Sequence, residues 1–110
     1  MFAVKLAEDK KAEGPVILNV GKISNLCDYF VILEAESSKR VDTIAEAIKD
    51  GFEKTGIKIL HYEGKNTCLW VLLDIGDVIV HIFRSDMREF YALERLWSSA
   101  EAVKLDNDKN

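Results

Sequence analysis

Residues 70–97 read WVLLDIGDVIVHIFRSDMREFYALERLW, and this stretch decides the fold. Two apolar runs meet at an Asp-Ile-Gly-Asp turn, and a helical pattern with arginines and aromatic residues follows almost at once. If Ile75 and Gly76 form a two-residue hairpin loop, the numbers of residues paired across the hairpin sum to one constant. This loop predicts three pairs: Asp74 with Asp77, Leu72 with Ile79, and Trp70 with His81.

The pair Asp74–Asp77 has two interpretations. Like charges that face each other on a sheet are destabilising, by a few tenths to about 1 kcal/mol. Folding alone does not call for such a pair, whereas a basic partner would relieve the repulsion. In the other interpretation, Asp simply suits turn positions and both side chains point into water.

The composition is that of one soluble globular domain. Of the 110 residues, 48% are hydrophobic and 31% are charged, as in ordinary folded domains. We expect a single domain over residues 1–105 and a polar tail over residues 106–110. The formal charge of −4 argues against broad nucleic-acid binding and leaves room for a basic protein partner.

Targeting and redox features favour a cytoplasmic protein. No apolar run is long enough to cross a bilayer, and the N-terminal residues lack a signal-peptide core. Cys27 and Cys68 are too few and too far apart for a zinc motif. A single disulfide between them stays open, although a cytoplasmic chain would keep both thiols reduced.

Periodicity predicts three helices and five strands. The helices are expected at 2–13, 38–54 and 87–97, and the strands at 15–20, 29–34, 57–62, 68–74 and 77–83. Phe2, Leu6 and Val4 are expected to face inward from the first helix. Ser37 or Ser38 caps the second helix and Gly56 ends it, while Asp86 with Glu89 resembles a capping box for the third.

This element order defines the fold class as α/β, with a mixed sheet of about five strands and flanking helices. The helix at 38–54 is a crossover, which favours parallel pairing between the strands it joins, 29–34 and 57–62. The hairpin at 68–83 must be antiparallel.

Enzymatic function has little support in these residues. His61 and His81 lie on expected strands, and no serine sits in a nucleophile elbow. The strongest enzyme alternative is a metal-dependent nucleotidyltransferase that uses Asp74, Asp77 and the Ser37-Ser38 turn at a helix start. No acid-x-acid pair follows the serines, and Glu36 would repel an incoming phosphate. We therefore expect the Ser37-Ser38 turn to be structural.

A protein-binding surface has more support. Trp70 and Asp74 share one face of their strand, and Arg88, Tyr91 and Arg95 share one face of the last helix. Tyr, Trp and Arg are enriched at interface hot spots. The alternatives are ordinary core packing for Trp70, a half-buried Tyr91 ring, and solvated salt bridges for the arginines.

The chain resembles the ribosomal silencing factor family, also called Iojap-like proteins. The matching segments are DYFVI at 28–32, SSKRV at 37–41, EG at 63–64, WVLLDIGDVIVHIF at 70–83, and REFYALERLW at 88–97. This resemblance covers roughly residues 8–97 and implies a nucleotidyltransferase-like fold without its catalytic acids. It also implies binding to the large ribosomal subunit through ribosomal protein fourteen, which blocks joining of the small subunit and lowers translation under starvation.

The resemblance and the residue pattern together predict a partner-binding site. Its residues are Trp70, Asp74, Ile75, Asp77, His81, Arg88, Tyr91 and Arg95. Two positions depart from the family pattern: Ala35-Glu36 stands where the family often has Gly-Thr, and Ala92 where it usually has Asn or Asp. We expect no catalysis, no metal and no cofactor, and a homodimer at high concentration that uses part of the same surface.

Overall fold

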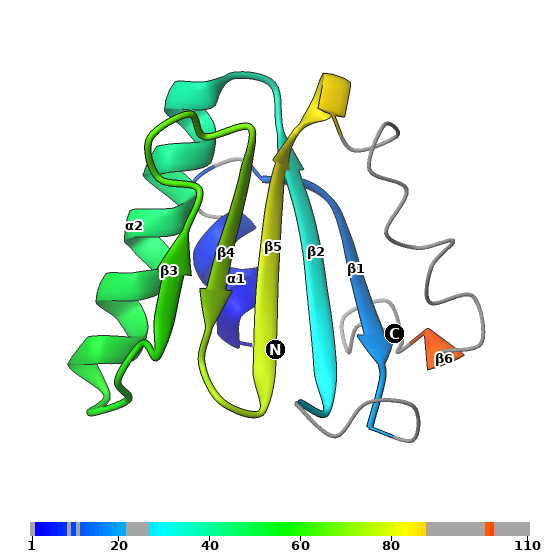
Figure 1. The fold of residues 1–110 in the computed structure, drawn as a ribbon, viewed down its shortest axis with the longest axis vertical. Coiled ribbons are helices and arrows are strands. Elements are labelled where there is room, and N and C mark those ends of the chain that lie inside the picture. The colour runs from blue at the N-terminus through cyan, green and yellow to red at the C-terminus, as the bar shows by residue number, and fades with distance from the viewer. Residues whose placement is uncertain (1, 9, 11, 22–26, 88–100, 103–110) are drawn as a thin grey trace.

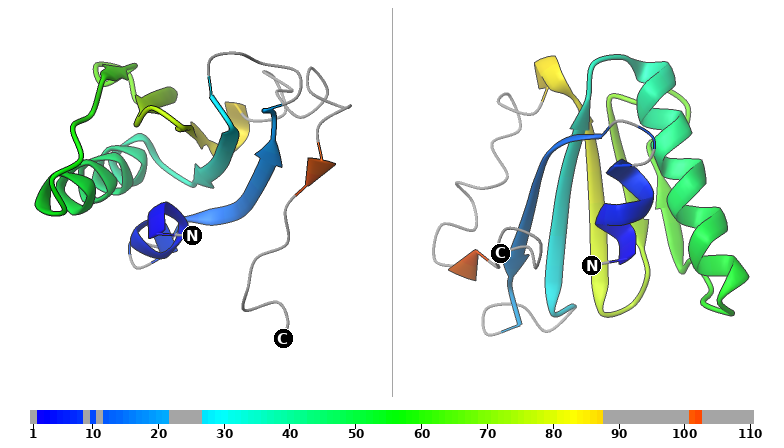
Figure 2. Two further views of the ribbon diagram at one scale, coloured as in Figure 1. Left: turned by 90° about the horizontal axis from the view of Figure 1, so that it is seen from below. Right: turned by 180° about the vertical axis from the view of Figure 1, so that it is seen from behind.

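In the described part of the chain, one mixed sheet carries helices α1 and α2 on one of its faces (Figure 1, Figure 2). This computed structural model describes residues 2–8, 10, 12–21, 27–87 and 101–102. Its elements are α1 (Phe2–Glu8), β1 (Glu13–Asn19), β2 (Tyr29–Ala35), α2 (Ser38–Lys54), β3 (His61–Glu63), β4 (Trp70–Asp74), β5 (Val78–Arg84) and β6 (Glu101–Ala102). The α/β class and the mixed sheet are confirmed.

The strand order is β3-β4-β5-β2-β1-β6. Five of these strands were expected, and the two-residue β6 adds a short antiparallel pairing to β1. The predicted parallel pair, formed by the strands at 29–34 and 57–62, is wrong. The strand parallel to β2 is β5, whereas β3 lies at the sheet edge beside β4. The hairpin of β4 and β5 occupies the place next to β2, so the crossover passes over two strands.

Local signals define α2 at both of its ends. The Ser37 hydroxyl accepts a hydrogen bond from the Arg40 N–H at 3.1 Å, which confirms the expected N-cap. At the other end Gly56 has φ +87°, and its N–H donates to the Glu53 carbonyl while the Ile57 N–H donates to the Phe52 carbonyl. This pair of bonds is the Schellman motif that ends many helices at a glycine.

The N-terminal helix is shorter than expected. α1 ends at Glu8, and β1 already begins at Glu13, with an irregular register between Glu13 and Val16. Ala3 and Val4 are buried, but Phe2 is 44% exposed and meets the ring of Phe52 edge-on. The expectation that Phe2 faces the core is therefore wrong, because the stripe that α1 turns toward the sheet is centred on Ala3 and Val4, and Phe2 points away from it.

The hairpin register differs from the expected one by two residues. Asp74 pairs with Ile79, Leu72 with His81, and Trp70 with Phe83. The Ile75 N–H bonds to the Val78 carbonyl at 2.9 Å, so Gly76 and Asp77 form the loop. Gly76 has φ +101° and takes the first loop position, where a type II′ turn needs glycine. The expected facing of Asp74 and Asp77 is wrong, but a shift of two residues leaves every side chain on its expected face.

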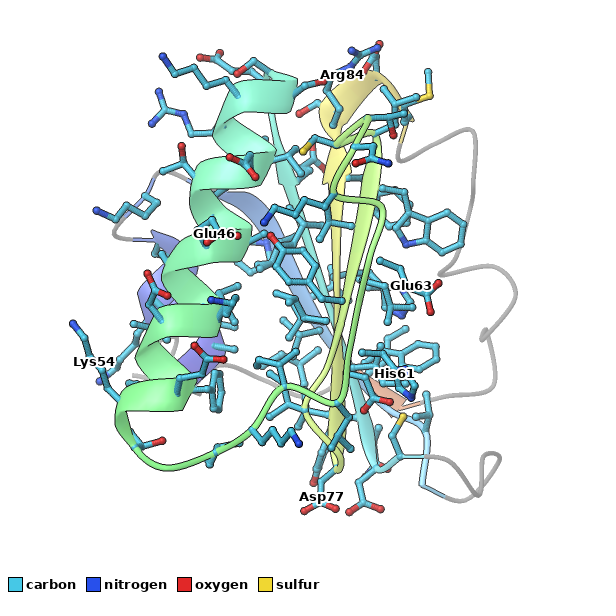
Figure 3. All side chains as sticks on the ribbon, turned by 60° about the vertical axis from the view of Figure 1, so that its left-hand side comes forward. Glu46, Lys54, His61, Glu63, Asp77 and Arg84 are labelled. Carbon is cyan, nitrogen blue, oxygen red and sulfur yellow. The ribbon has the colours of Figure 1, made fainter. Side chains whose placement is uncertain are left out.

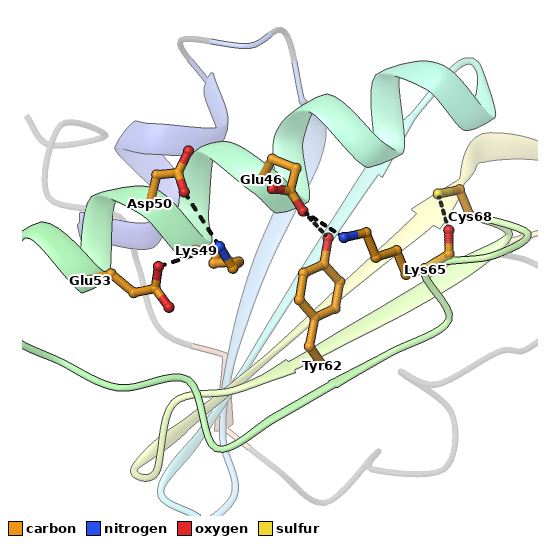
Figure 4. A network of polar contacts seen from close by, with 7 residues as sticks. All are labelled: Glu46, Lys49, Asp50, Glu53, Tyr62, Lys65 and Cys68. Atoms are coloured by element: carbon orange, nitrogen blue, oxygen red, sulfur yellow. Dashed lines mark hydrogen bonds and ion pairs between the residues drawn. The ribbon is translucent and has the colours of Figure 1, made fainter.

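The edge strand β3 is tied to α2 by a polar network (Figure 4). The Tyr62 hydroxyl donates to Glu46 at 2.8 Å, and Lys65 lies 3.7 Å from the same carboxylate and over the Tyr62 ring. Burial and the bond to Glu46 raise the pKa of Tyr62. The strand expected at 57–62 contracts to His61–Glu63, and Ile57 and Leu60 remain outside the sheet.

Two apolar layers flank the sheet. The layer beneath α1 and α2 contains buried residues from both helices, from alternate strand positions and from the loop before β4: Ala3, Val4, Ile17, Val31, Leu33, Ala35, Val41, Ile44, Ala45, Ile48, Cys68, Val71, Leu73, Val80 and Ile82. The opposite face, called here the outer face, contains a second buried group: Leu18, Val20, Cys27, Phe30, Ile32 and Phe83. β2 is therefore buried on both faces, as its continuous apolar run predicts.

Candidate functional site

Alternation along β4 and β5 places the aromatic part of the candidate site on the outer face. Val71 and Leu73 are buried toward the helices, so Trp70 and Asp74 point the other way and are half-buried. Figure 3 shows the labelled His61 and Glu63 of β3 on this same side of the sheet, away from Glu46 on α2. The expectation that Trp70 and Asp74 share a face is confirmed.

Trp70 is held by two neighbours on β5. Its indole Nε1–H donates to His81 Nδ1 at 3.0 Å. Its rings stack on Phe83 with centroids 5.1 Å apart and planes 29° apart. His81 is only 4% exposed, and burial lowers the pKa of its imidazole to about 4. At neutral pH His81 is therefore an uncharged side chain that contacts Trp70 from within the sheet layer.

The hairpin end forms the acidic part of the candidate site (Figure 3). Asp77 is exposed, whereas the Asp74 carboxylate accepts the Gly76 N–H at 2.9 Å and stabilises the turn. The Asp77 carbonyl accepts the N–H groups of Asp28 and Tyr29 at 2.8 and 3.1 Å. The turn therefore carries a structural hydrogen bond as well as charge. Asp suits these turn positions, as the second interpretation has it, but only Asp77 is exposed to water, since Asp74 is half-buried and bonded to the turn.

Two residues at this end were missed by sequence reasoning. Asp28 is exposed and lies beside the hairpin, and its charge and that of Asp74 add to the burial that raises the pKa of the Cys27 thiol. Leu60 is 54% exposed, yet its N–H donates to the Asp74 carbonyl at 2.8 Å, next to the turn. No sequence pattern around Asp28 or Leu60 predicts that either residue lies beside the hairpin, because each reaches it only through hydrogen bonds between segments that are distant in sequence.

Three predicted site residues lie outside the described part of the chain: Arg88, Tyr91 and Arg95. Residues 88–97 of the helix expected at 87–97, with the Glu89 of its predicted capping box, also lie outside the described residues. Asp86 does not take the N-cap position, because a helical turn already begins at residue 85. Instead the Asp86 carboxylate accepts hydrogen bonds from Arg84 at 2.7 and 2.9 Å. These bonds hold the pKa of the Asp86 carboxyl below its usual value.

The serines of the alternative enzyme site have structural partners. Ser37 caps α2, and the Ser38 hydroxyl accepts a hydrogen bond from Arg84 at 3.3 Å. A cavity of about 270 Å³ at this helix start is lined by Ser37, Lys39, Arg40 and Thr43. Within the described ranges, the structure contains no group of three or more His, Cys, Asp or Glu side chains placed to hold a metal ion.

The fold and the described site define a class: an α/β domain with one mixed sheet, whose outer face presents an indole at the start of β4 and carboxylates at the hairpin turn that follows the other end of β4. A family model described as "Ribosomal silencing factor during starvation" matches residues 1–110, and the chain belongs to this family. The family name denotes a regulatory role on the ribosome rather than a catalytic one.

Individual relatives agree with this assignment. The ribosomal silencing factor of Halalkalibacterium halodurans is 44% identical over 105 residues, which cover 96% of this chain and 90% of that protein. The factor of Bacillus subtilis is 42% identical over 109 residues, covering 99% and 92%. A crystal structure of a Bacillus halodurans protein, 44% identical, superposes with a TM-score of 0.84 over 94% of this chain and 93% of its own. Across the described residues, no helix is long and apolar enough to span a membrane.

Proposed function

We propose that this protein represses translation in the cytoplasm by binding the large ribosomal subunit through ribosomal protein fourteen. Occupation of that surface sterically blocks joining of the small subunit, so the mechanism requires no catalysis. Membership of the silencing family over residues 1–110 carries this proposal. The choice of partner comes from the family resemblance, and the acidic hairpin end suits a basic partner.

The contact surface combines an aromatic group with carboxylates. Trp70 offers a large, rigid apolar ring with one polar atom, a combination that is enriched at interface hot spots. Asp74 and Asp77, with Ile75 between them, contribute the acidic hairpin end. The exposed Asp28 adds a carboxylate there, and the exposed Leu60 adds an apolar side chain. Arg88, Tyr91 and Arg95 complete the proposed contacts.

Trp70→Ala is expected to weaken binding to purified large subunits by about 2 kcal/mol or more, roughly 30-fold in Kd, if Trp70 is a hot spot. Circular dichroism and thermal unfolding first establish that the variant is folded. The matched control is Phe2→Ala, which removes a 44% exposed aromatic ring from α1 in the helical layer. If folded Trp70→Ala binds as tightly as the parent, the contact surface lies elsewhere, and the exposed face of α2 becomes the next candidate.

The double variant Asp74→Asn, Asp77→Asn is expected to weaken binding and to flatten its dependence on salt. Stability should change little, because the amide oxygen introduced by Asp74→Asn can still accept the Gly76 N–H. The control Asp50→Asn, Glu53→Gln makes the same charge change on α2, where both residues pair with Lys49. Equal binding by parent and hairpin variant at moderate salt would rule out this electrostatic role.

Self-association is the expected behaviour of the free protein. An apolar patch with a polar rim favours dimerisation when its partner is absent. We infer a symmetric homodimer at high concentration that competes with ribosome binding. Sedimentation of the parent and of Trp70→Ala then measures whether the two processes share a surface.

A further inference from the structure

His81 is a polar side chain enclosed by apolar neighbours on the outer face. It pairs with Leu72 on β4 and with Ile32 on β2, and the Phe30 ring meets it edge-on at 4.8 Å. Burying an imidazole in such surroundings costs free energy unless hydrogen bonds compensate. One bond is present, from Trp70, while no described residue accepts a hydrogen bond from His81 Nε2. Within the described part of the chain, the one hydrogen-bond partner of His81 is therefore Trp70, the proposed contact residue.

The direction of this bond determines the state of the imidazole. An indole nitrogen only donates, so His81 Nδ1 must be an unprotonated acceptor. In the neutral ring the remaining proton then resides on Nε2. Protonation of Nδ1 would abolish the bond, and burial opposes that protonation.

We propose that His81 is a positioning residue for partner binding, whose Nδ1 holds the Trp70 indole in the orientation that meets the partner. With 4% of its surface exposed, His81 acts through Trp70 rather than by contact of its own. The bond to His81 and the stacking on Phe83 together fix both the tilt and the rotation of the indole. This inference rests on the proposed function, in which Trp70 contacts the large subunit.

Preorganisation gives the expected size of the effect. Immobilising a free side chain at an interface weakens binding by an amount that corresponds to roughly 2- to 10-fold in Kd. Loss of the His81 acceptor should therefore weaken subunit binding by about that factor. The loss should be smaller than that caused by removing Trp70 itself.

The test compares His81→Leu, which removes the acceptor, with His81→Asn, which places an amide oxygen near the position of Nδ1. Each is measured for binding to large subunits and for the NMR signal and solvent exchange of the Trp70 indole N–H. Trp70→Phe assigns that signal, since Trp97 is the chain's other tryptophan. We expect His81→Leu to shift the signal, to speed its exchange and to weaken binding, and His81→Asn to restore all three.

A Trp70→Phe background separates this inference from the proposed function. There His81→Leu should cause no further loss of binding, and an equal loss would overturn the positioning role. An unchanged affinity of His81→Leu despite a displaced indole signal would also overturn it. If Trp70→Ala leaves binding intact, the proposed contact surface is wrong. The indole N–H signals of the parent and of His81→Leu still show whether the bond between Trp70 and His81 forms. If His81→Leu does not fold, the ¹⁵N chemical shifts of the His81 imidazole in the parent protein test the proposal. They show which ring nitrogen carries the proton, and a proton on Nδ1 would contradict the proposal.

Discussion

Gly64→Ala is expected to lower the free energy of unfolding by about 3 kcal/mol or more, a large effect for a single methyl group. A Cβ atom at this position would lie 2.0 Å from the Trp70 carbonyl oxygen, and the backbone has φ +84°. The contact between this Cβ atom and the Trp70 carbonyl oxygen would force β3 and β4 apart, because a backbone carbonyl cannot rotate away as a flexible side chain can. The glycine of the Glu63-Gly64 motif thus permits the close approach that places Trp70.

Gly56→Ala is the matched control for this prediction. Gly56 has nearly the same backbone conformation, φ +87°, but an added Cβ would meet nothing within 4 Å. Its cost should be the strain of a left-handed alanine, about 1–2 kcal/mol. Urea unfolding of both variants measures the difference, and equal losses would show that the contact with Trp70 relaxes without cost.

Acidification from pH 6.5 to pH 4 is expected to remove about 3 kcal/mol of stability through His81 alone. Burial lowers the pKa of folded His81 to about 4 from its ordinary 6.5, so between these values the unfolded chain binds the proton more strongly. The contribution is fully present above pH 6.5 and is lost as the pH falls toward 4. The physical cause is desolvation of the charged imidazole in an apolar layer.

Urea unfolding of the parent and of His81→Asn between pH 7 and pH 4 measures this contribution of His81 to the free energy of unfolding. The variant lacks the titrating group but retains an acceptor for Trp70, and the carboxylates titrate in both proteins. The difference in unfolding free energy between them should therefore change by about 3 kcal/mol across this range. Parallel curves would mean that His81 is as readily protonated in the folded protein as in the unfolded chain.

Elements with purely local signals were predicted well from the sequence. α2 has a serine N-cap, an apolar stripe and a C-terminal glycine within one continuous segment, and its bounds are those expected. The face of each residue on β4 and β5 also follows from alternation alone. These features depend on interactions between residues that are close in sequence.

Elements whose limits depend on distant contacts were predicted less well. The apolar residues Ile57 and Leu60 resemble strand residues but remain exposed, because β4 pairs only with His61–Glu63. The predicted hairpin register was wrong because the sequence allows either Ile75-Gly76 or Gly76-Asp77 as the two-residue loop. A bond between Ile75 and Val78, with Asp74 bonded to the Gly76 N–H, selects the second loop.

For the candidate site, the sequence by itself determined which residues carry the chemistry: an indole, two hairpin carboxylates and a strand histidine. Only the tertiary structure decided how they are used. Pairing of β4 with β5 buries His81 and turns it toward Trp70, and the docking of β2 brings Asp28 to the hairpin. The reason is physical, since residue type and period set which face a side chain occupies, whereas strand order and register set its neighbours.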